Sequence, residues 1–141
     1  MQVLFTTGTT AIDVVQSVAV IVGMPASVSV ASANTAFYVQ LGILNLTGNT
    51  VQVYQPVNPA GPLQVSLTNS NATVAQLVTT GGSGAQATVT VPVGLSNSPT
   101  SKAAGGVEFD PLATGITTLS TSVTGFYNSW PGAPLIVTVT P

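Results

Sequence analysis

Hydrophobic and polar residues alternate along most of this chain with a period of two. The alternation is clearest in the last third, at residues 107–109, 117–123 and 135–140, where valine, leucine and phenylalanine take turns with threonine, serine and glutamate. Period-two alternation rich in β-branched residues is typical of strands that bury one face. The pattern therefore predicts a chain built from strands that each turn one face toward a core.

Shorter alternating segments precede these three, and turn-forming residues separate them. Turn signals such as Gly48-Asn49, Asn58-Pro-Ala-Gly-Pro62 and Gly81-Gly-Ser-Gly84 recur about every 8–12 residues, as in β-sandwiches. No helix start signal is followed by a period of 3.6. We expect about eight or nine short strands from residue 25 onward, which indicates an all-β antiparallel sandwich rather than strands alternating with helices. The expected strands before the last third lie near 28–30, 37–41, 51–54, 63–68, 74–78 and 86–91.

Residues 1–22 differ from the rest of the chain. A run of valine and isoleucine between Ile12 and Val22 is apolar at both alternating sets of positions from Val18 onward, and Gly23-Met24-Pro25 ends it. Branched Cβ atoms disfavour a helix here. A strand that is apolar on both faces needs cover on both faces.

Five phrases after Pro25 carry a resemblance to a known family. They are Val65-Ser-Leu-Thr-Asn-Ser-Asn71, Ala87-Thr-Val-Thr-Val-Pro92, Pro111-Leu-Ala-Thr-Gly115, Thr124-Gly-Phe126 and Val137-Thr-Val-Thr-Pro141. With them, residues 25–141 resemble the bacterial immunoglobulin-like (Big-type) modules that occur as tandem repeats in large surface and secreted proteins. The resemblance implies an immunoglobulin-like antiparallel β-sandwich. It leaves the role open among spacers, stalks, adhesins and virion decorations.

In such tandem arrays, a valine-rich strand closes one repeat and runs into the next, and Ser17-Val-Ala-Val-Ile-Val22 resembles that closing strand. Residues 1–16 are too few to form a preceding repeat. We therefore expect residues 1–22 to be an extended N-terminal β-arm that adds a strand to a neighbouring subunit, and residues 23–141 to be the sandwich. The alternative is that the arm folds back as an extra strand on its own sandwich. The residues expected to contact the neighbour are Val14, Val15, Val18, Val20, Ile21 and Val22.

The chain is almost free of ionic side chains, with one Lys, three acidic residues and no His, or 3% charged residues, against about 25% in an average soluble domain. Low charge weakens repulsion between copies and so favours association. One lysine cannot supply the cationic track that phosphates need, which argues against nucleic acid as a partner. Without His and Cys, triads and thiol nucleophiles are excluded, and we expect no enzyme. No apolar run reaches the roughly 20 residues of a transmembrane helix, and no signal peptide is visible.

Glu108 and Asp110 are the two acidic residues closest in sequence, and they fall on one face of a predicted strand. They could act as a paired-carboxylate site or contribute to a Ca²⁺ site, which would need further oxygen ligands. The simpler interpretation places both in solvent, with Lys102 as a partner. Ser101 is adjacent to Lys102, so an extended chain points the two side chains apart and disfavours a catalytic dyad. Ca²⁺ is thus the one cofactor that the sequence suggests.

Aromatic residues and glycosylation sequons suggest contacts with glycans. Trp130 and Tyr127 lie in the loop before the last strand, where a tryptophan is either a plug on the end of the sandwich or a shelf for a sugar. Asn45-Leu-Thr47 and Asn71-Ala-Thr73 match the N-glycosylation sequon at turn-like positions.

Taken together, these patterns favour a structural role. We expect a subunit of an extracellular or cell-surface filament, tube or layer that self-assembles into a homopolymer through its N-terminal arm. The alternative is an immunoglobulin-like adhesin, carbohydrate-binding module or virion-decoration module, which would place the chain on a virion surface or against a glycan.

Overall fold

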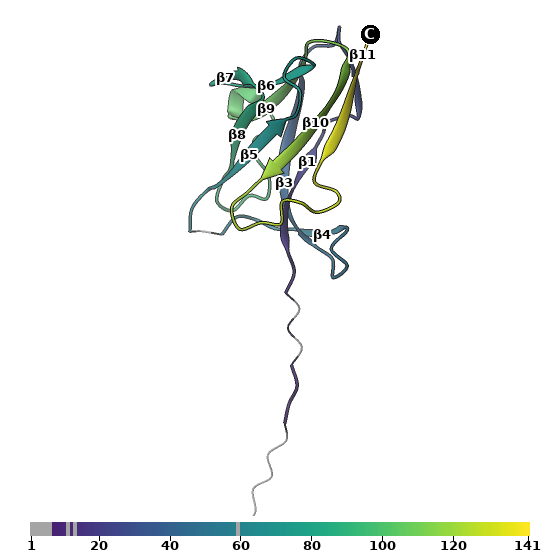
Figure 1. Ribbon diagram of the computed structural model, residues 1–141. Helices are drawn as coiled ribbons and strands as arrows, with labels where there is room; N and C mark the ends of the chain where they lie inside the picture. The colour runs from purple at the N-terminus through teal and green to yellow at the C-terminus, as the bar shows by residue number, and fades with distance from the viewer. Residues whose placement is uncertain (1–6, 11, 13, 59) are drawn as a thin grey trace, which may run out of the picture.

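Two β-sheets pack face to face in the computed structural model, which describes residues 7–10, 12, 14–58 and 60–141 (Figure 1). Its elements are β1 (Ser17–Val22), β2 (Ser27–Ser29), β3 (Thr35–Leu44), β4 (Val51–Tyr54), β5 (Leu63–Asn69), β6 (Ala75–Thr79), β7 (Gly82–Gly84), β8 (Gln86–Val91), the 3-10 helix η1 (Lys102–Ala104), β9 (Val107–Pro111), β10 (Gly115–Ser122) and β11 (Leu135–Thr140).

The order of the strands is that of an immunoglobulin-like sandwich. The first sheet runs β1-β3-β9-β6-β7, with β4 also paired to β3, and the second runs β2-β11-β10-β5-β8. Immunoglobulin constant-type domains place strands A, B, E and D in one sheet and C, F and G in the other. Here β1-β3-β9-β6 and β5-β10-β11 occupy these positions in the same chain order. The predicted all-β, immunoglobulin-like sandwich is therefore confirmed for the described part of the chain.

The chain changes sheet immediately after β1. Strand β1 pairs antiparallel with β3, from Ser17 opposite Ile43 to Val22 opposite Tyr38. Gly23, at a φ of 87° that side-chain-bearing residues rarely adopt, and Pro25 then redirect the backbone. Strand β2 next pairs in parallel with β11 in the other sheet. The N-terminal part of the sandwich thus joins both sheets.

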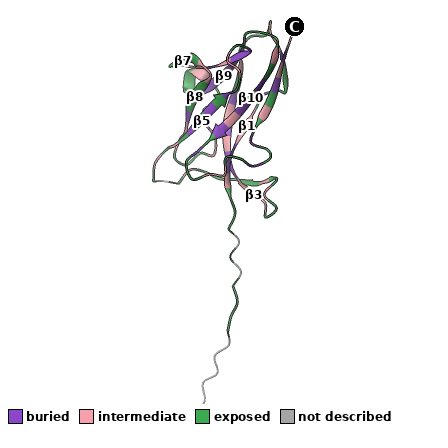
Figure 2. Ribbon diagram, viewed as in Figure 1, coloured by how far each residue is buried: buried purple, intermediate pink, exposed green. Residues whose placement is uncertain are grey.

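The main core lies between the sheets and follows the predicted alternation. In β9, Val107 and Phe109 are fully buried, whereas Glu108 and Asp110 alternate with them and are only partly buried. Phe37 on β3 and Leu119 on β10 face the same core from the two sheets. Figure 2 shows the buried positions concentrated within the two sheets, whereas the described part of the N-terminal segment is exposed.

A second, smaller apolar cluster covers the other face of β1. It buries Val18, Leu44, Trp130 and Ala133, and Val20 packs against it. Ala19 and Ile21 alternate with Val18 and Val20 and belong to the main core instead. Because Trp130 and Ala133 lie between β10 and β11, this loop folds over the outer face of the first sheet.

Candidate functional site

The described residues that precede β1 extend away from the sandwich along its long axis (Figure 1). Ile12 is 83% exposed, Val14 is 88% exposed and Val15 is 38% exposed. Two of the six predicted arm residues therefore lie on this segment: Val14 is almost fully exposed, whereas Val15 lies beside Phe126 and Tyr127 and is partly covered by its own chain. Asp13, the remaining acidic residue, falls outside the described residues.

The other four predicted arm residues lie inside the sandwich, which corrects the prediction for this part of the arm. Val18, Val20, Ile21 and Val22 belong to β1, whose six residues pair with β3 of the same chain. Val18 is fully buried. The domain boundary that the sequence predicts between residues 22 and 23 therefore lies after the first strand of the sandwich and not before it. For residues 17–22 the structure shows the alternative, in which the arm folds back onto its own sandwich.

The physical expectation that β1 needs cover on both faces is met within one chain. One face of β1 contributes to the main core, and the loop that carries Trp130 covers the opposite face. Trp130 is only 6% exposed, and its indole Nε1 is buried without a hydrogen-bond partner among the described residues. This tryptophan is thus a plug on the sandwich and offers no exposed ring to a sugar, which leaves the half-buried Tyr127 as the accessible aromatic residue of the predicted pair.

Backbone hydrogen bonds fix the point where the extended segment leaves the sandwich. The N–H of Leu44 donates to the carbonyl of Gln16 at 3.0 Å, and the N–H of Tyr127 donates to the carbonyl of Ser17 at 2.9 Å. The hydroxyl of Thr121 donates to the carbonyl of Ala19 at 3.1 Å. These bonds hold Gln16 and the first residues of β1 from β3, from β10 of the facing sheet and from the loop that follows β10, so the direction of the segment is set at its root.

A cleft of about 580 Å³ opens at the same end of the sandwich. Ser17 lines it, together with the end of β3, the segment that leads into β5, and Phe126. Its apolar walls are formed by Leu41, Ile43, Pro56, Val57, Leu63 and Phe126. None of the residues around the cleft is charged. A smaller hollow beside Val15 and Gln16 shares Ser17 and Phe126 with the cleft, so the root of the extended segment borders both.

Strand β8 forms one edge of the second sheet, and the three-residue strand β2 forms the other. Strand β8 pairs with β5 over six residues in regular register, from Leu63 opposite Val91 to Thr68 opposite Gln86, and it ends the strand order of that sheet. Every second residue of such an edge turns its N–H and C=O away from the sheet. The segment Gln86–Val91 contains no charged residue and no proline to block a further strand.

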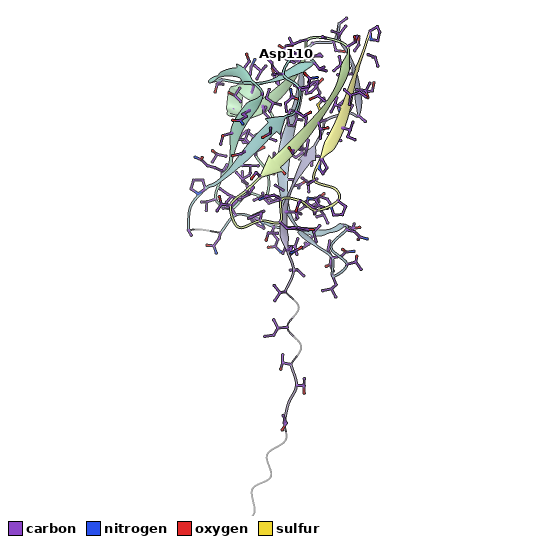
Figure 3. The ribbon with its side chains drawn as sticks, in the orientation of Figure 1. Asp110 is labelled. Atoms are coloured by element: carbon purple, nitrogen blue, oxygen red, sulfur yellow. The ribbon has the colours of Figure 1, made fainter. Side chains whose placement is uncertain are left out.

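Glu108 and Asp110 lie on β9 as predicted, on the face opposite Val107 and Phe109. Lys102 Nζ lies 3.2 Å from Glu108 Oε2, and the Asn34 amide nitrogen donates to the same oxygen at 3.4 Å. Figure 3 places Asp110 at the end of the sandwich away from the extended segment. Within the described residues, no three acidic, His or Cys side chains gather into a possible metal site. The interpretation with Lys102 as partner of Glu108 is confirmed, and a Ca²⁺ site that uses Glu108 and Asp110 stays a prediction.

The two glycosylation sequons differ in how their asparagines are bonded. The side-chain nitrogen of Asn45 donates to Asn49 Oδ1 at 3.2 Å, and Asn45 Oδ1 accepts the N–H of Asn49, so the amide holds a turn together. Asn71 Oδ1 accepts the Thr73 hydroxyl at 2.7 Å. A glycan on the Asn45 nitrogen would share that nitrogen with its bond to Asn49, whereas the bonds of the Asn71 side chain to Thr73 use its oxygen, so Asn71 is the better placed acceptor. Modification of either residue stays a prediction.

The sequence predicts neither the cleft nor the position of β8 at an edge of its sheet. The signal for the cleft was the phrase Asn58-Pro-Ala-Gly-Pro62, which predicts a turn but says nothing of the wall that it forms with Phe126, more than sixty residues later. The signal for β8 was its alternation, which predicts a strand but not its place in a sheet.

Comparison of the chain with protein-family models, with curated proteins and with solved structures finds no match. Across the described residues, the structure contains no helix with the length and apolarity needed to cross a lipid bilayer.

Proposed function

We propose that this protein is a structural subunit of an extracellular, self-assembling filament, tube or surface layer, and that the residues before Ser17 make the contact between neighbouring subunits. The observation that carries this proposal is the exposure of Ile12 and Val14, at 83% and 88%, on a segment that stands clear of the sandwich. The contact with a neighbouring subunit, which the sequence predicted for all of residues 1–22, is thus proposed for the residues before Ser17 alone.

The energetics support association through this segment. Burial of one valine or isoleucine side chain stabilises a contact by about 1.5–3 kcal/mol relative to its exposure to water. The opposing repulsion is small, because the whole chain carries four charged side chains and a formal net charge of −2. An extended segment can also satisfy its backbone N–H and C=O groups on a sheet edge of another copy.

The same proposal places the protein outside the cell, with the virion surface as the alternative. It also includes a relationship to the bacterial immunoglobulin-like repeats. The A-B-E-D and C-F-G arrangement of the strands supports both, because immunoglobulin-like sandwiches are frequent in cell-surface proteins. Virion decoration would use the same segment to attach the sandwich to a larger assembly.

The test compares the full chain with a chain that lacks residues 1–16. Negative-stain electron microscopy and sedimentation should show assemblies of the full chain and folded monomers of the shortened one, since the deletion spares every described strand. A second variant, Ile12→Ser with Val14→Ser, should also lose assembly although its length is unchanged. Assembly of the shortened chain into the same particles would overturn the proposal.

A further inference from the structure

We infer that Ile12 and Val14 of one copy occupy the apolar cleft at the base of a second copy, and that the two copies exchange these residues reciprocally. This inference rests on the proposed function, because it assumes that the segment before Ser17 mediates association. It adds the receptor site on the second copy and the symmetry of the first contact.

The cleft has the chemistry of a site for aliphatic side chains. Val57, Leu63 and Phe126 are partly buried and pack against the main core while also lining the cleft. The polar group of Asn58 is already engaged, since Asn58 Oδ1 accepts the N–H of Ala60 at 3.1 Å. Its size, about 580 Å³, lies within the range of roughly 300–1,000 Å³ that is usual for binding pockets.

The segment before Ser17 has the matching chemistry. Ile12 and Val14 offer two branched aliphatic side chains that are 83% and 88% exposed. Ser17 lines both the cleft and the smaller hollow at the root of the segment, and the segment runs away from its own sandwich (Figure 1). The bonds that Leu44 and Tyr127 make to the carbonyls of Gln16 and Ser17 hold it in that direction.

The position of the two features determines the symmetry of the contact. Because Ser17 and Phe126 border both the cleft and the root of the segment, we place the receiving copy base to base with the first. In that approach its own segment points toward the cleft of the first copy. Contacts of this kind use the same surface on both copies and close into a two-fold pair. Growth beyond the pair then requires a different contact, for which the free edge of β8 is available.

Cysteine cross-linking tests the receptor site, because the natural chain contains no cysteine. The full chain with Val14→Cys is mixed with a full chain of different mass that carries Val57→Cys, and the mixture is oxidised. We expect a cross-linked product that contains one copy of each. The matched control replaces Val57→Cys by Thr88→Cys, an exposed position on β8, and should give little product.

Each outcome of the cross-linking is decisive. A product with Thr88→Cys and none with Val57→Cys would overturn the inference and leave the proposed function standing, because the segment would then bind the β8 edge. A chain that carries both Val14→Cys and Val57→Cys and forms only an internal disulfide would show that the segment fills its own cleft, which also overturns the inference. No association by any variant or by the full chain would overturn both proposals.

Light scattering on the protein without cross-links measures the mass of the smallest assembly, which a reciprocal exchange requires to be a pair. At low concentration we expect the full chain to have twice the mass of one copy, and Ile12→Ser with Val14→Ser to have the mass of a single copy. The control pair Thr9→Ser with Thr10→Ser, on the same segment, should keep the doubled mass. A smallest species of three or more copies would contradict reciprocal exchange.

Discussion

Trp130 is the residue that allows β1 to be apolar on both faces. Its ring packs with Val18 and Leu44, yet within the described part of the chain its Nε1 hydrogen has no acceptor. A buried N–H without a partner costs about 1–3 kcal/mol in desolvation. The stability that Trp130 provides therefore comes from its apolar area alone.

We predict that Trp130→Ala lowers the free energy of unfolding by about 3–5 kcal/mol, as for other large-to-small changes of buried aromatic residues. Trp130→Phe should lose far less, because it keeps most of the ring and removes the unpaired N–H. Urea titrations followed by circular dichroism would measure both. Equal losses in the two variants would show that the indole nitrogen makes a bond that matters.

Thr117 is the centre of the buried polar corner between β5 and β10. The Thr117 hydroxyl donates to Asn69 Oδ1 and accepts the N–H of Asn71 at 3.1 Å. Thr117 as a whole is only 1% exposed. These bonds take the place of apolar packing at this end of the core.

We predict that Thr117→Val, which keeps the shape and removes the hydroxyl, destabilises the protein by about 1–3 kcal/mol, because it leaves buried partners unpaired. Thr118→Val is the matched control on the opposite face of the same strand and should change stability by less than about 0.5 kcal/mol. Thermal unfolding of the two variants gives the comparison. A neutral Thr117→Val would mean that the corner gains nothing from its hydrogen bonds.

Strand β1 is an integral part of the first sheet, and two deletions separate it from the segment that precedes it. Removal of residues 1–16 should lower the midpoint of thermal unfolding only slightly, since none of the described residues among them lies in a strand, although the bond from the Leu44 N–H to the Gln16 carbonyl is lost. Removal of residues 1–22 also takes away six residue pairs with β3 and the burial of Val18 and Ala19. That shortened chain should be largely unfolded or aggregated by circular dichroism and gel filtration. A stable fold without residues 1–22 would show that the sandwich does not need β1 and that β1 can act as an exchangeable arm.

The strands themselves could be predicted from the sequence because alternation is a local property. The alternation of Val107, Glu108 and Phe109 predicted both the strand and the face that it buries. The requirement of β1 for two-sided cover was also correct. The origin of the cover could not be predicted, because β3 of the same chain and an edge of another copy offer the same hydrogen bonds and the same burial. Expectation and structure also differ at Gly82–Gly84, where a predicted loop forms β7 by pairing with β6.

The candidate site was predicted only in part. Val14 and Val15 were identified because apolar residues before a complete sandwich have no place in its core. The cleft depends on Phe126 and Leu63 coming together across the fold, and no local pattern reports such a distant pair. The sequence could therefore suggest a segment that binds but not the surface that receives it.

The scarcity of charge is a property of the whole molecule and determines how its stability responds to pH. The ion pair between Lys102 and Glu108 is partly exposed, with side chains 38% and 22% accessible, and exposed pairs contribute about 0–1 kcal/mol. Because the whole chain carries only four charged side chains, few groups can link stability to pH, so the free energy of unfolding should stay nearly constant between about pH 3 and about pH 10. Urea titrations at several pH values measure it. A steep acid transition would reveal a buried or metal-bound carboxylate.

The same scarcity of charge determines how association should respond to salt. Contacts between charged surfaces weaken when the Debye length falls to about 3 Å at 1 M salt, whereas apolar contacts persist, and sulfate strengthens them because it is excluded from the protein surface. Since Ile12 and Val14 are apolar and the cleft is uncharged, we predict that the dimer dissociation constant stays nearly constant in sodium chloride and decreases in ammonium sulfate. Sedimentation equilibrium across both salt series measures this constant. Dissociation by sodium chloride would require an ionic contact, for which a chain with one lysine has almost no candidates.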